Sequence, residues 1–367
     1  MATNEPTKIL ITGASGFLGN AITEALLSRV PPFEITTLDR EPLRQSLDIT
    51  RLKRHIIADI TDRDSVANAF RTATPDLVVH TAGTVPIGKY RYTTSAVAWA
   101  RVRAINYTGT RHVLDAALHA GCGRFLHTSS CTVVTDDVDT DYRRMEEEAL
   151  LPLGNAKLFY GKSKALAEQY VLDPIHAETK GLKAIALRPA TIIGPGDLQV
   201  ISTLHGCIRN GETAFVVGDG DNIYDWMYID NAVHAHLLAV ENLLSPNPTA
   251  AGQAFFISNQ EPVYFWDFLL YVWAQFGHVP PRRFHIPPAV AWVAGALAEF
   301  GGWVRGAGST LSRGSVKDGA RTHYASNEKA KQVLGYVPRV SLAEGVRRSC
   351  EAYKMYLVEK ESKKSAQ

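Results

Sequence analysis

The sequence predicts an α/β fold, with a doubly wound parallel sheet and a smaller, discontinuous C-terminal substrate lobe. Through the first two thirds of the chain, short runs rich in β-branched residues alternate with longer helical stretches. The runs are apolar at consecutive positions, as in Ile9-Leu10-Ile11, which is typical of strands covered by helices on both faces. The chain of 367 residues is long enough for about two domains.

The elements follow in a regular order. Strands are expected at 8–12, 34–39, 55–59, 77–82, 124–130 and 183–189, each joined to the next by a helical stretch. After Pro189 the pattern changes to turns rich in glycine and proline, and the apolar run at 254–257 is expected to return to the sheet. We therefore predict a first domain at 1–190 with returning segments at about 222–260, and a substrate lobe at 191–221 and 261–353. A polar tail at 354–367 is expected to fray.

Composition excludes several functional classes. The net charge of +2 removes the main driving force for binding nucleic acid. Four cysteines without a Cys-x-x-Cys spacing predict reduced thiols, and the N-terminus has no signal-peptide pattern, so a cytoplasmic protein is expected. The acidic stretch at 136–148 is interpreted as a solvated loop.

Residues 286–304 are the most apolar segment of the later chain. Pro287-Pro288 and Gly301-Gly302 leave an uninterrupted run of about half the ~20 residues that a bilayer span needs, so no transmembrane helix is predicted. We favour a helix that covers the substrate pocket, with a peripheral contact to an intracellular membrane as the alternative. The other partner considered is a second copy of the chain, in a homodimer.

A glycine-rich turn directly follows the first strand. Gly13, Gly16 and Gly19 are three residues apart and open a helix through Phe17 and Leu18, with Ser15 inside the turn. The first glycine permits the tight turn, the second lets backbone amides approach a pyrophosphate, and the third allows close packing of helix on strand. A strand before the turn and a helix after it predict a Rossmann-type dinucleotide site.

Acidic residues at the ends of the next two strands point to the adenosine half of a cofactor. Asp39 lies twenty residues after Gly19, where a carboxylate accepts both ribose hydroxyls and repels a 2′-phosphate. This favours NAD, but Arg40 partly offsets the repulsion, so NADP stays an alternative. Asp59 is interpreted either as a partner of the adenine amine or as a helix cap.

Tyr160 and Lys164 carry the predicted chemistry. They are four residues apart in a helical stretch at 158–170 and therefore share one face. An ammonium group near a phenol favours phenolate, which can take a proton from an alcohol. Earlier, a strand ends in Thr128-Ser129-Ser130, where a hydroxyl can hold the substrate oxygen.

At this point the sequence resembles an extended short-chain dehydrogenase/reductase, and within that superfamily the 3β-hydroxysteroid dehydrogenase and sterol-4α-carboxylate 3-dehydrogenase group. The similar phrases are found at 13–19, 59–62, 79–83, 106–110, 160–168, 188–194 and 227–236. The resemblance implies that Tyr160 is the catalytic base, Lys164 holds the nicotinamide ribose, and Ser130 binds the reacting oxygen. Asn106 matches an active-site asparagine of the superfamily, and Pro189 matches the segment that packs against the nicotinamide. Cofactor contacts are likewise implied for Ile60, Thr81, Ala82 and Gly83.

One departure from the motifs of the superfamily helps to choose between its steroid-acting and sugar-nucleotide-acting branches. In sugar-nucleotide epimerases and dehydratases of this superfamily, an arginine that grips the diphosphate precedes an Asp-Tyr pair, and the matching stretch here is Tyr224-Asp225-Trp226. The missing arginine removes a charge-assisted bond that a diphosphate needs. We take Tyr224 and Trp226 as substrate residues, because an aromatic-rich lobe suits a small apolar substrate. No metal site is predicted, since His80, His234 and His236 lack a partner at ligand spacing.

These observations predict an NAD(P)-dependent oxidoreductase acting on a secondary alcohol or ketone of a sterol, steroid or terpenoid-like substrate. If the substrate carries a neighbouring carboxylate, the product is a β-keto acid, which can lose carbon dioxide. The alternatives are a sugar-nucleotide epimerase or dehydratase and a non-catalytic NAD-sensing regulator.

Overall fold

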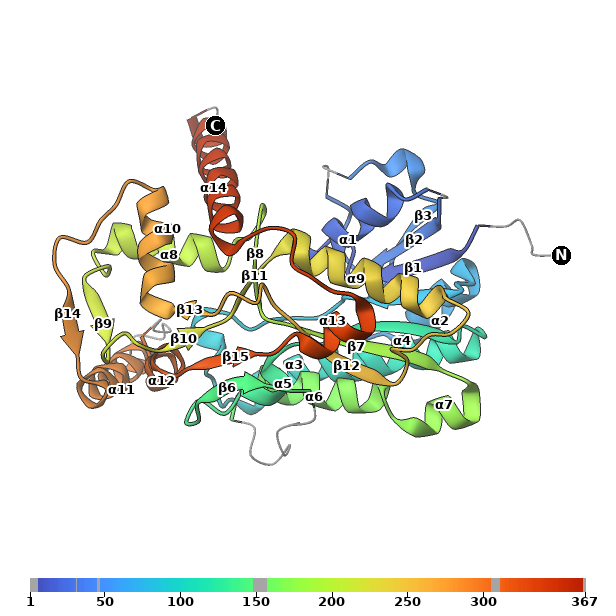
Figure 1. Ribbon diagram of the computed structural model, residues 1–367, viewed down its shortest axis with the longest axis horizontal. Coiled ribbons are helices and arrows are strands. Elements are labelled where there is room, and N and C mark those ends of the chain that lie inside the picture. Colours follow the sequence, from blue (N-terminus) through green and yellow to red (C-terminus); the bar gives the residue numbers. More distant parts are fainter. Residues whose placement is uncertain (1–5, 31, 45–46, 148–156, 305–310, 366–367) are drawn as a thin grey trace.

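The computed structural model describes residues 6–30, 32–44, 47–147, 157–304 and 311–365 (Figure 1). Its main sheet has seven strands in the order β12-β7-β5-β4-β1-β2-β3. All neighbouring pairs are parallel, so the predicted doubly wound sheet is confirmed. The strands are β1 (Lys8–Thr12), β2 (Glu34–Asp39), β3 (Arg54–Ile57), β4 (Leu77–His80), β5 (Arg124–Thr128), β7 (Lys183–Pro189) and β12 (Gln253–Ile257).

Helices cover both faces of this sheet. Ile9 and Ile11 of β1 point to the face covered by α1 (Phe17–Leu27) and α9 (Ile229–Leu244), whereas Leu10 points to the face covered by α2 (Arg63–Ala73) and α4 (Thr110–His119). Because successive side chains of a strand alternate between faces, a strand buried on both must be apolar throughout. The other elements on this side of the molecule are η1 (Ile49–Arg51), η2 (Gly88–Tyr90), α3 (Ala96–Arg103), a π-helical turn η3 (Ala104–Gly109), α5 (Thr132–Thr135), α6 (Phe159–Val171) and α7 (Pro174–Lys180).

The strand order reverses between β1 and β4. The chain runs from β1 outward to β2 and β3, then crosses to β4 and continues outward through β5, β7 and β12. In doubly wound sheets the loops at such a switch point diverge and leave a crevice at the carboxyl ends of the strands, where ligands bind. The glycine-rich turn follows β1, and Ser130 follows β5, so both lie at this edge.

The second group of elements gathers on the left of Figure 1, around a core rich in tryptophan. Its sheets are β13-β10-β15-β6, β11-β8 and β14-β9. Their bounds are β6 (Tyr142–Met145), β8 (Thr191–Ile193), β9 (Phe215–Val217), β10 (Ile223–Tyr224), β11 (Trp226–Tyr228), β13 (Val263–Tyr264), β14 (Phe284–Ile286) and β15 (His323–Ala325). The helices are α8 (Val200–Asn210), α10 (Phe265–Gln275), α11 (Pro288–Val304), α12 (Arg313–Ala320) and α14 (Leu342–Ser365). Helix α13 (Glu328–Leu334) packs instead on α9 and β12, in the core of the main sheet. The domain limits proposed from the sequence stay a prediction.

Several local expectations differ from the structure. Strands β3 and β5 end two residues early, so Asp59 and Ser130 lie in the loops that follow them. The tail expected to fray from Lys354 is helical to Ser365, because α14 is anchored in the lobe core at its start and continues with residues that favour helices. The acidic stretch contains β6 and two buried carboxylates, Asp136 and Glu147, so it is not simply a solvated loop.

The apolar segment at 286–304 forms α11. Ala291 and Gly295 are buried, and a Cβ added at Gly295 would lie 2.8 Å from the Ser312 carbonyl carbon, so this side of the helix packs closely on the start of α12. The opposite stripe, formed by Val290, Val293, Leu297 and Phe300, is exposed. Among the described residues, no helix combines the length and the hydropathy needed to cross a membrane.

Candidate active site

The glycine-rich turn brings the end of β1 against the start of α1. Gly13 has φ +79°, in the left-handed region that favours glycine, and its N–H donates to the Leu38 carbonyl at 2.9 Å. A Cβ added at Gly19 would lie 2.1 Å from the Gly13 carbonyl oxygen and 2.6 Å from Thr81 Oγ1. The backbone therefore approaches itself too closely for any other residue. This geometry fits the phosphate cradle of a dinucleotide, with Phe17 and Leu18 in the first turn of α1.

Asp39 lies directly beside this turn. Its Oδ2 accepts the Ser15 N–H at 2.9 Å and its Oδ1 accepts the Glu41 N–H at 3.1 Å. These bonds hold the carboxylate at the end of β2, next to the cradle, where a ribose would lie. Arg40 is exposed and its Nε lies 3.5 Å from Glu41 Oε1, so its charge is partly offset by a carboxylate.

The other predicted cofactor residues lie around the same edge. Asp59 Oδ1 accepts both the N–H and the hydroxyl of Thr61 at 2.8 Å, and these bonds lower the pKa of Asp59. Ile60 is buried against Gly109, since a Cβ added at Gly109 would lie 2.7 Å from the Ile60 Cδ1.

The end of β4 is held to β1, and the end of β7 to the loop after β5. Thr81 Oγ1 donates to the Thr12 carbonyl at 2.7 Å, and the Ala82 N–H donates to Thr12 Oγ1 at 3.4 Å. The Pro189 carbonyl accepts the Cys131 N–H at 3.1 Å.

Ser130 lies within hydrogen-bond reach of Tyr160, and Lys164 follows one turn later on the same helix, α6. Burial raises the pKa of Tyr160 to about 12, and a hydrogen bond from Ser130 opposes this shift. Lys164 is 5% exposed, its Nζ donates to the Thr128 carbonyl at 2.5 Å, and burial lowers its pKa to about 8. A buried phenol that is hydrogen-bonded to a hydroxyl can hold and move a proton at the oxygen of an alcohol.

Asn106 is linked to the same helix. It lies in the π-helical turn η3, an irregularity found often at functional sites. Its Oδ1 accepts the Thr84 N–H at 2.8 Å, and its Nδ2 donates to Ser163 Oγ at 3.0 Å. Ser163 Oγ in turn donates to the Tyr160 carbonyl at 2.7 Å. A Cβ added at Gly83 would lie 3.3 Å from Asn106 Oδ1, so the loop after β4 passes close by.

The neighbouring hydroxyls have structural partners instead. Ser129 Oγ donates to Glu168 Oε2 at 2.6 Å, and Thr128 Oγ1 lies 2.9 Å from His236 Nε2. Ser130 is therefore the hydroxyl of this run that faces Tyr160. Within the part of the chain that the structure describes, no three His, Cys, Asp or Glu side chains gather as metal ligands would.

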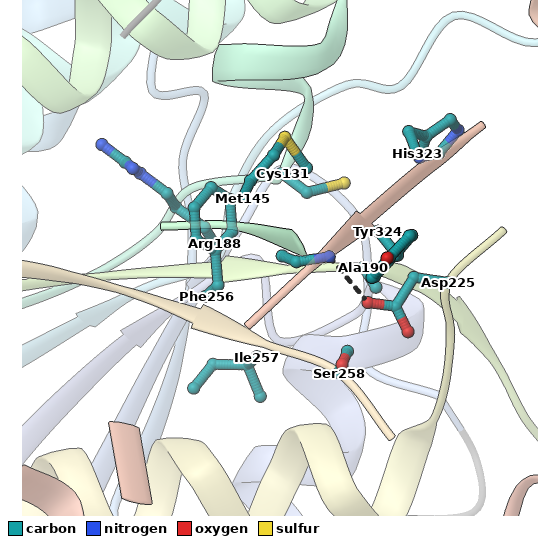
Figure 2. A pocket seen from close by; sticks show the side chains of 11 residues that line it. Cys131, Met145, Arg188, Ala190, Asp225, Phe256, Ile257, Ser258, His323 and Tyr324 are labelled. Atoms are coloured by element: carbon teal, nitrogen blue, oxygen red, sulfur yellow. Dashed lines mark hydrogen bonds between the residues drawn. The ribbon is translucent and has the colours of Figure 1, made fainter. Parts of the chain in front are cut away.

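The two predicted substrate residues have different surroundings. Trp226 is 4% exposed and stacks on Phe268 at 3.8 Å between ring centres, so it belongs to the lobe core and we do not retain it as a substrate contact. Tyr224 is partly buried, and its ring centre lies 3.8 Å from that of His323. The adjacent Asp225 borders a cavity of about 10 Å³ together with Cys131 and His323 (Figure 2). That volume suffices for about one water molecule, not for a substrate.

Two groups beside Tyr160 were not foreseen from the sequence. Arg91 and Asp136 form a buried ion pair next to the catalytic helix. An acidic residue soon after the Ser-Ser strand end was a usable signal for Asp136. No comparable sequence signal exists for Arg91, because it lies in an irregular loop that is far from Tyr160 along the chain.

Comparisons with known proteins agree with this geometry. The sequence model of the 3-beta hydroxysteroid dehydrogenase/isomerase family matches residues 10–288. The decarboxylating sterol-4-alpha-carboxylate 3-dehydrogenase of Schizosaccharomyces pombe is 35% identical over 347 residues, covering 93% of this chain and 96% of the relative. The human enzyme of the same description is 30% identical and covers 96% of this chain and 89% of its own length.

Solved structures share the fold at lower sequence similarity. UDP-glucose 4-epimerase of Thermotoga maritima, solved with UDP-glucose, aligns with a TM-score of 0.69 and 22% identity, covering 95% of this chain and 99% of its own. The Thermus thermophilus UDP-glucose 4-epimerase, in complex with NAD, aligns with a TM-score of 0.68 and 21% identity, covering 94% of this chain and 98% of its own. These likenesses concern the fold.

Proposed function

The chain belongs to the 3-beta hydroxysteroid dehydrogenase/isomerase family, and we propose that it oxidises the 3-hydroxyl of a sterol that carries a carboxylate on the neighbouring carbon. Its yeast and human relatives are sterol-4-alpha-carboxylate 3-dehydrogenases. It is accordingly an NAD(P)-dependent oxidoreductase of CH–OH groups. The observation that carries the proposal is the hydrogen bond between Ser130 and the buried Tyr160, with Lys164 one turn further along α6.

The glycine-rich turn and Asp39 fit NAD(P). Backbone amides at the start of α1 would hold the pyrophosphate, and Asp39 would accept the adenine ribose hydroxyls. Because this carboxylate repels a 2′-phosphate, we propose NAD as the preferred form. Bound NAD(P) accepts the hydride that leaves the carbinol carbon.

The protein side chains handle the proton. Ser130 holds the substrate oxygen, and Tyr160 removes the hydroxyl proton as the carbonyl forms. We propose that Lys164 holds the nicotinamide ribose and, with the cofactor bound, favours ionisation of the Tyr160 phenol. Asn106 fixes the first turn of α6 through Ser163, and thereby the position of Tyr160.

Decarboxylation follows from the product. A carboxylate next to the new ketone makes a β-keto acid, in which the bond to the carboxylate breaks, carbon dioxide leaves, and the electron pair forms an enolate. The enolate then takes up a proton to give the ketone. This step needs neither a metal nor further residues.

The decisive experiment measures NADH formation across a panel. The panel holds a 3-hydroxy-4-carboxysterol, 3-hydroxysteroids, terpenoid alcohols and a UDP-sugar. We expect turnover of the carboxysterol, with a 3-ketosterol one carbon shorter detected by mass spectrometry. Conversion of the UDP-sugar alone, followed by chromatography because an epimerase or dehydratase returns the hydride and releases no net NADH, would overturn the proposal in favour of one of these enzymes.

Tyr160→Phe tests the mechanism itself. The variant should lose turnover yet bind NAD with unchanged affinity, because the phenol oxygen does not belong to the glycine-rich cradle. Turnover at the wild-type rate would contradict the assignment of Tyr160 as base, whereas loss of NAD binding would indicate a folding defect.

The exposed stripe of α11 favours a peripheral contact with a lipid surface. Val290, Val293, Leu297 and Phe300 recur at positions that share one helix face, and all four are more than half exposed. Arg282 and Arg283, just before β14, are also exposed and complement anionic headgroups. A sterol substrate resides in membranes, so such a contact would place the site near its supply.

Flotation with phosphatidylcholine/phosphatidylserine vesicles tests this contact. The wild-type chain should float with the vesicles, and Leu297→Asp combined with Phe300→Asp should not. The matched control is Met355→Asp with Val358→Asp on α14, where both side chains are 63% exposed. Equal flotation of both double variants would refute the contact. The homodimer stays a prediction, checked by analytical ultracentrifugation.

A further inference from the structure

Arg91 and Asp136 form a close ion pair beside the catalytic helix. Arg91 follows η2 and Asp136 follows α5, so the two come from different loops. Arg91 Nη2 lies 2.6 Å from Asp136 Oδ1, and Nη1 lies 3.2 Å from Oδ2. The Asp136 side chain is fully buried, and that of Arg91 is 16% exposed. A bidentate pair of this kind fixes both groups in position as well as in charge.

The pair touches the catalytic helix at two adjacent residues. Asp136 Oδ2 accepts the Gly161 N–H at 2.5 Å, in the first turn of α6. The Arg91 guanidinium carbon lies over the Tyr160 ring, 5.7 Å from its centre. A Cβ added at Gly161 would lie 2.5 Å from both Cβ and Oδ2 of Asp136. The close approach of Asp136 to the helix therefore depends on the glycine that follows Tyr160.

We propose that Arg91 and Asp136 are positioning residues for Tyr160, in which Asp136 fixes the start of α6 and Arg91 provides a cation that favours the phenolate. The inference rests on the proposed function, in which Tyr160 is the base. A cation over a ring face interacts more strongly with a phenolate than with a phenol, because the ring then carries a full negative charge.

The surroundings of Tyr160 determine the sign of each effect. Burial raises its pKa, the Ser130 hydrogen bond and Arg91 lower it, and Cys131 and Asp136 raise it. Arg91 and Asp136 thus act in opposite directions on the same proton.

Other charged side chains near α6, in the part of the chain that the structure describes, are engaged with other partners. Lys164, on the helix itself, donates to the Thr128 carbonyl, and Glu168 pairs with Arg188 of β7. On the packed helices α3 and α4, Arg103 lies over the Tyr107 ring and Arg111 over that of Tyr170. The nearby Asp318–Arg321 pair of the α12 region is internally neutral.

The test compares the pH dependence of kcat/KM for alcohol oxidation. Oxidation requires Tyr160 to accept a proton, so its pKa sets the acid limb of the profile. Arg91→Gln should move this limb up by about one pH unit, the lower end of the effect expected for a charge ~6 Å away. Asp136→Asn should move it down, and Arg91→Lys should leave it close to wild type. A role limited to packing would lower kcat at every pH and leave the limb in place.

Controls separate charge from folding. Lys162→Gln removes a cation two residues from Tyr160 that lies over Trp99 instead, 5.2 Å from the ring centre, and should leave the profile unchanged. Circular dichroism reports whether each variant folds. If Asp136→Asn does not fold, the double variant Arg91→Gln/Asp136→Asn removes both charges, and its limb should lie below that of Arg91→Gln.

A direct titration distinguishes failure of this inference from failure of the proposed function. Labelling tyrosine with 13C at Cζ gives an NMR signal for Tyr160, which is assigned by its absence in Tyr160→Phe. The pH dependence of this signal gives the pKa of Tyr160 without any substrate. A Tyr160 pKa that is higher in Arg91→Gln supports the inference even if no alcohol of the panel is oxidised. An equal pKa in folded wild type and Arg91→Gln overturns it, even if the carboxysterol is turned over.

Discussion

Glu168→Gln should destabilise the protein strongly, although Glu168 touches neither Tyr160 nor the glycine-rich turn. Glu168 and Arg188 are 1% and 3% exposed, and the guanidinium reaches the carboxylate with Nη2–Oε1 at 2.6 Å and Nε–Oε2 at 3.0 Å. Ser129 Oγ donates to the same carboxylate at 2.6 Å. The substitution keeps the volume but leaves the arginine charge without a buried counter-charge.

The expected loss follows from this geometry. Breaking a buried ion pair by neutralising one partner costs about 3–5 kcal/mol of the free energy of unfolding. With an unfolding entropy of about 2 cal/mol/K per residue over 367 residues, such a loss lowers Tm by roughly 4–7 °C. Differential scanning calorimetry and urea titration at pH 7 measure it. We also expect lower kcat, because Ser129 and Ser130 occupy the same loop.

Two controls make the interpretation specific. Glu344→Gln removes a carboxylate that binds Arg347 at the surface of α14 and should leave Tm unchanged. Glu168→Leu combined with Arg188→Met removes both charges and should cost less than Glu168→Gln alone. The reasoning is refuted if Glu168→Gln melts within about 1 °C of wild type, or if the double variant is the less stable of the two.

Three further predictions concern the cofactor cradle and one buried acid. Gly19→Ala should abolish NAD binding measured by calorimetry, because the added Cβ would lie 2.1 Å from the Gly13 carbonyl, whereas Gly206→Ala, with no atom within 4 Å, should bind normally. Asp39→Ala should lower kcat/KM for NAD by roughly 10- to 100-fold and raise the preference for NADP, and an unchanged ratio of the two values would argue against a ribose contact. Burial raises the pKa of Asp225 from 3.8 to about 7 in the folded protein, so wild-type stability falls as pH rises from about 4 to 7. Asp225→Asn should therefore raise the free energy of unfolding at pH 8 by at most about 4 kcal/mol, with a higher Tm, and should leave both unchanged at pH 4. An equal change of Tm at both pH values would contradict this linkage between protonation and stability.

The alternation of strands and helices could be read from the sequence because it is encoded locally. A strand buried on both faces must be apolar at each position, and a phosphate cradle must have glycine where backbone atoms meet. The boundaries were less accurate: β5 ends at Thr128, and the Ser129 side chain bonds Glu168 of the distant helix α6, which no local pattern announces. The helical end of α14 was missed because its polar composition indicated a frayed tail.

By itself, the sequence determined the sheet, the cradle with Asp39, and the pairing of Tyr160 with Lys164 on one helix face. These depend on residues near one another along the chain, whose spacing fixes their geometry. Only the tertiary structure decided which hydroxyl faces Tyr160, that Trp226 belongs to the core, and that Arg91 and Asp136 lie against the catalytic helix. Such contacts join distant segments. Their electrostatic effect depends on burial, which exists only once the sheet and the lobe have packed together.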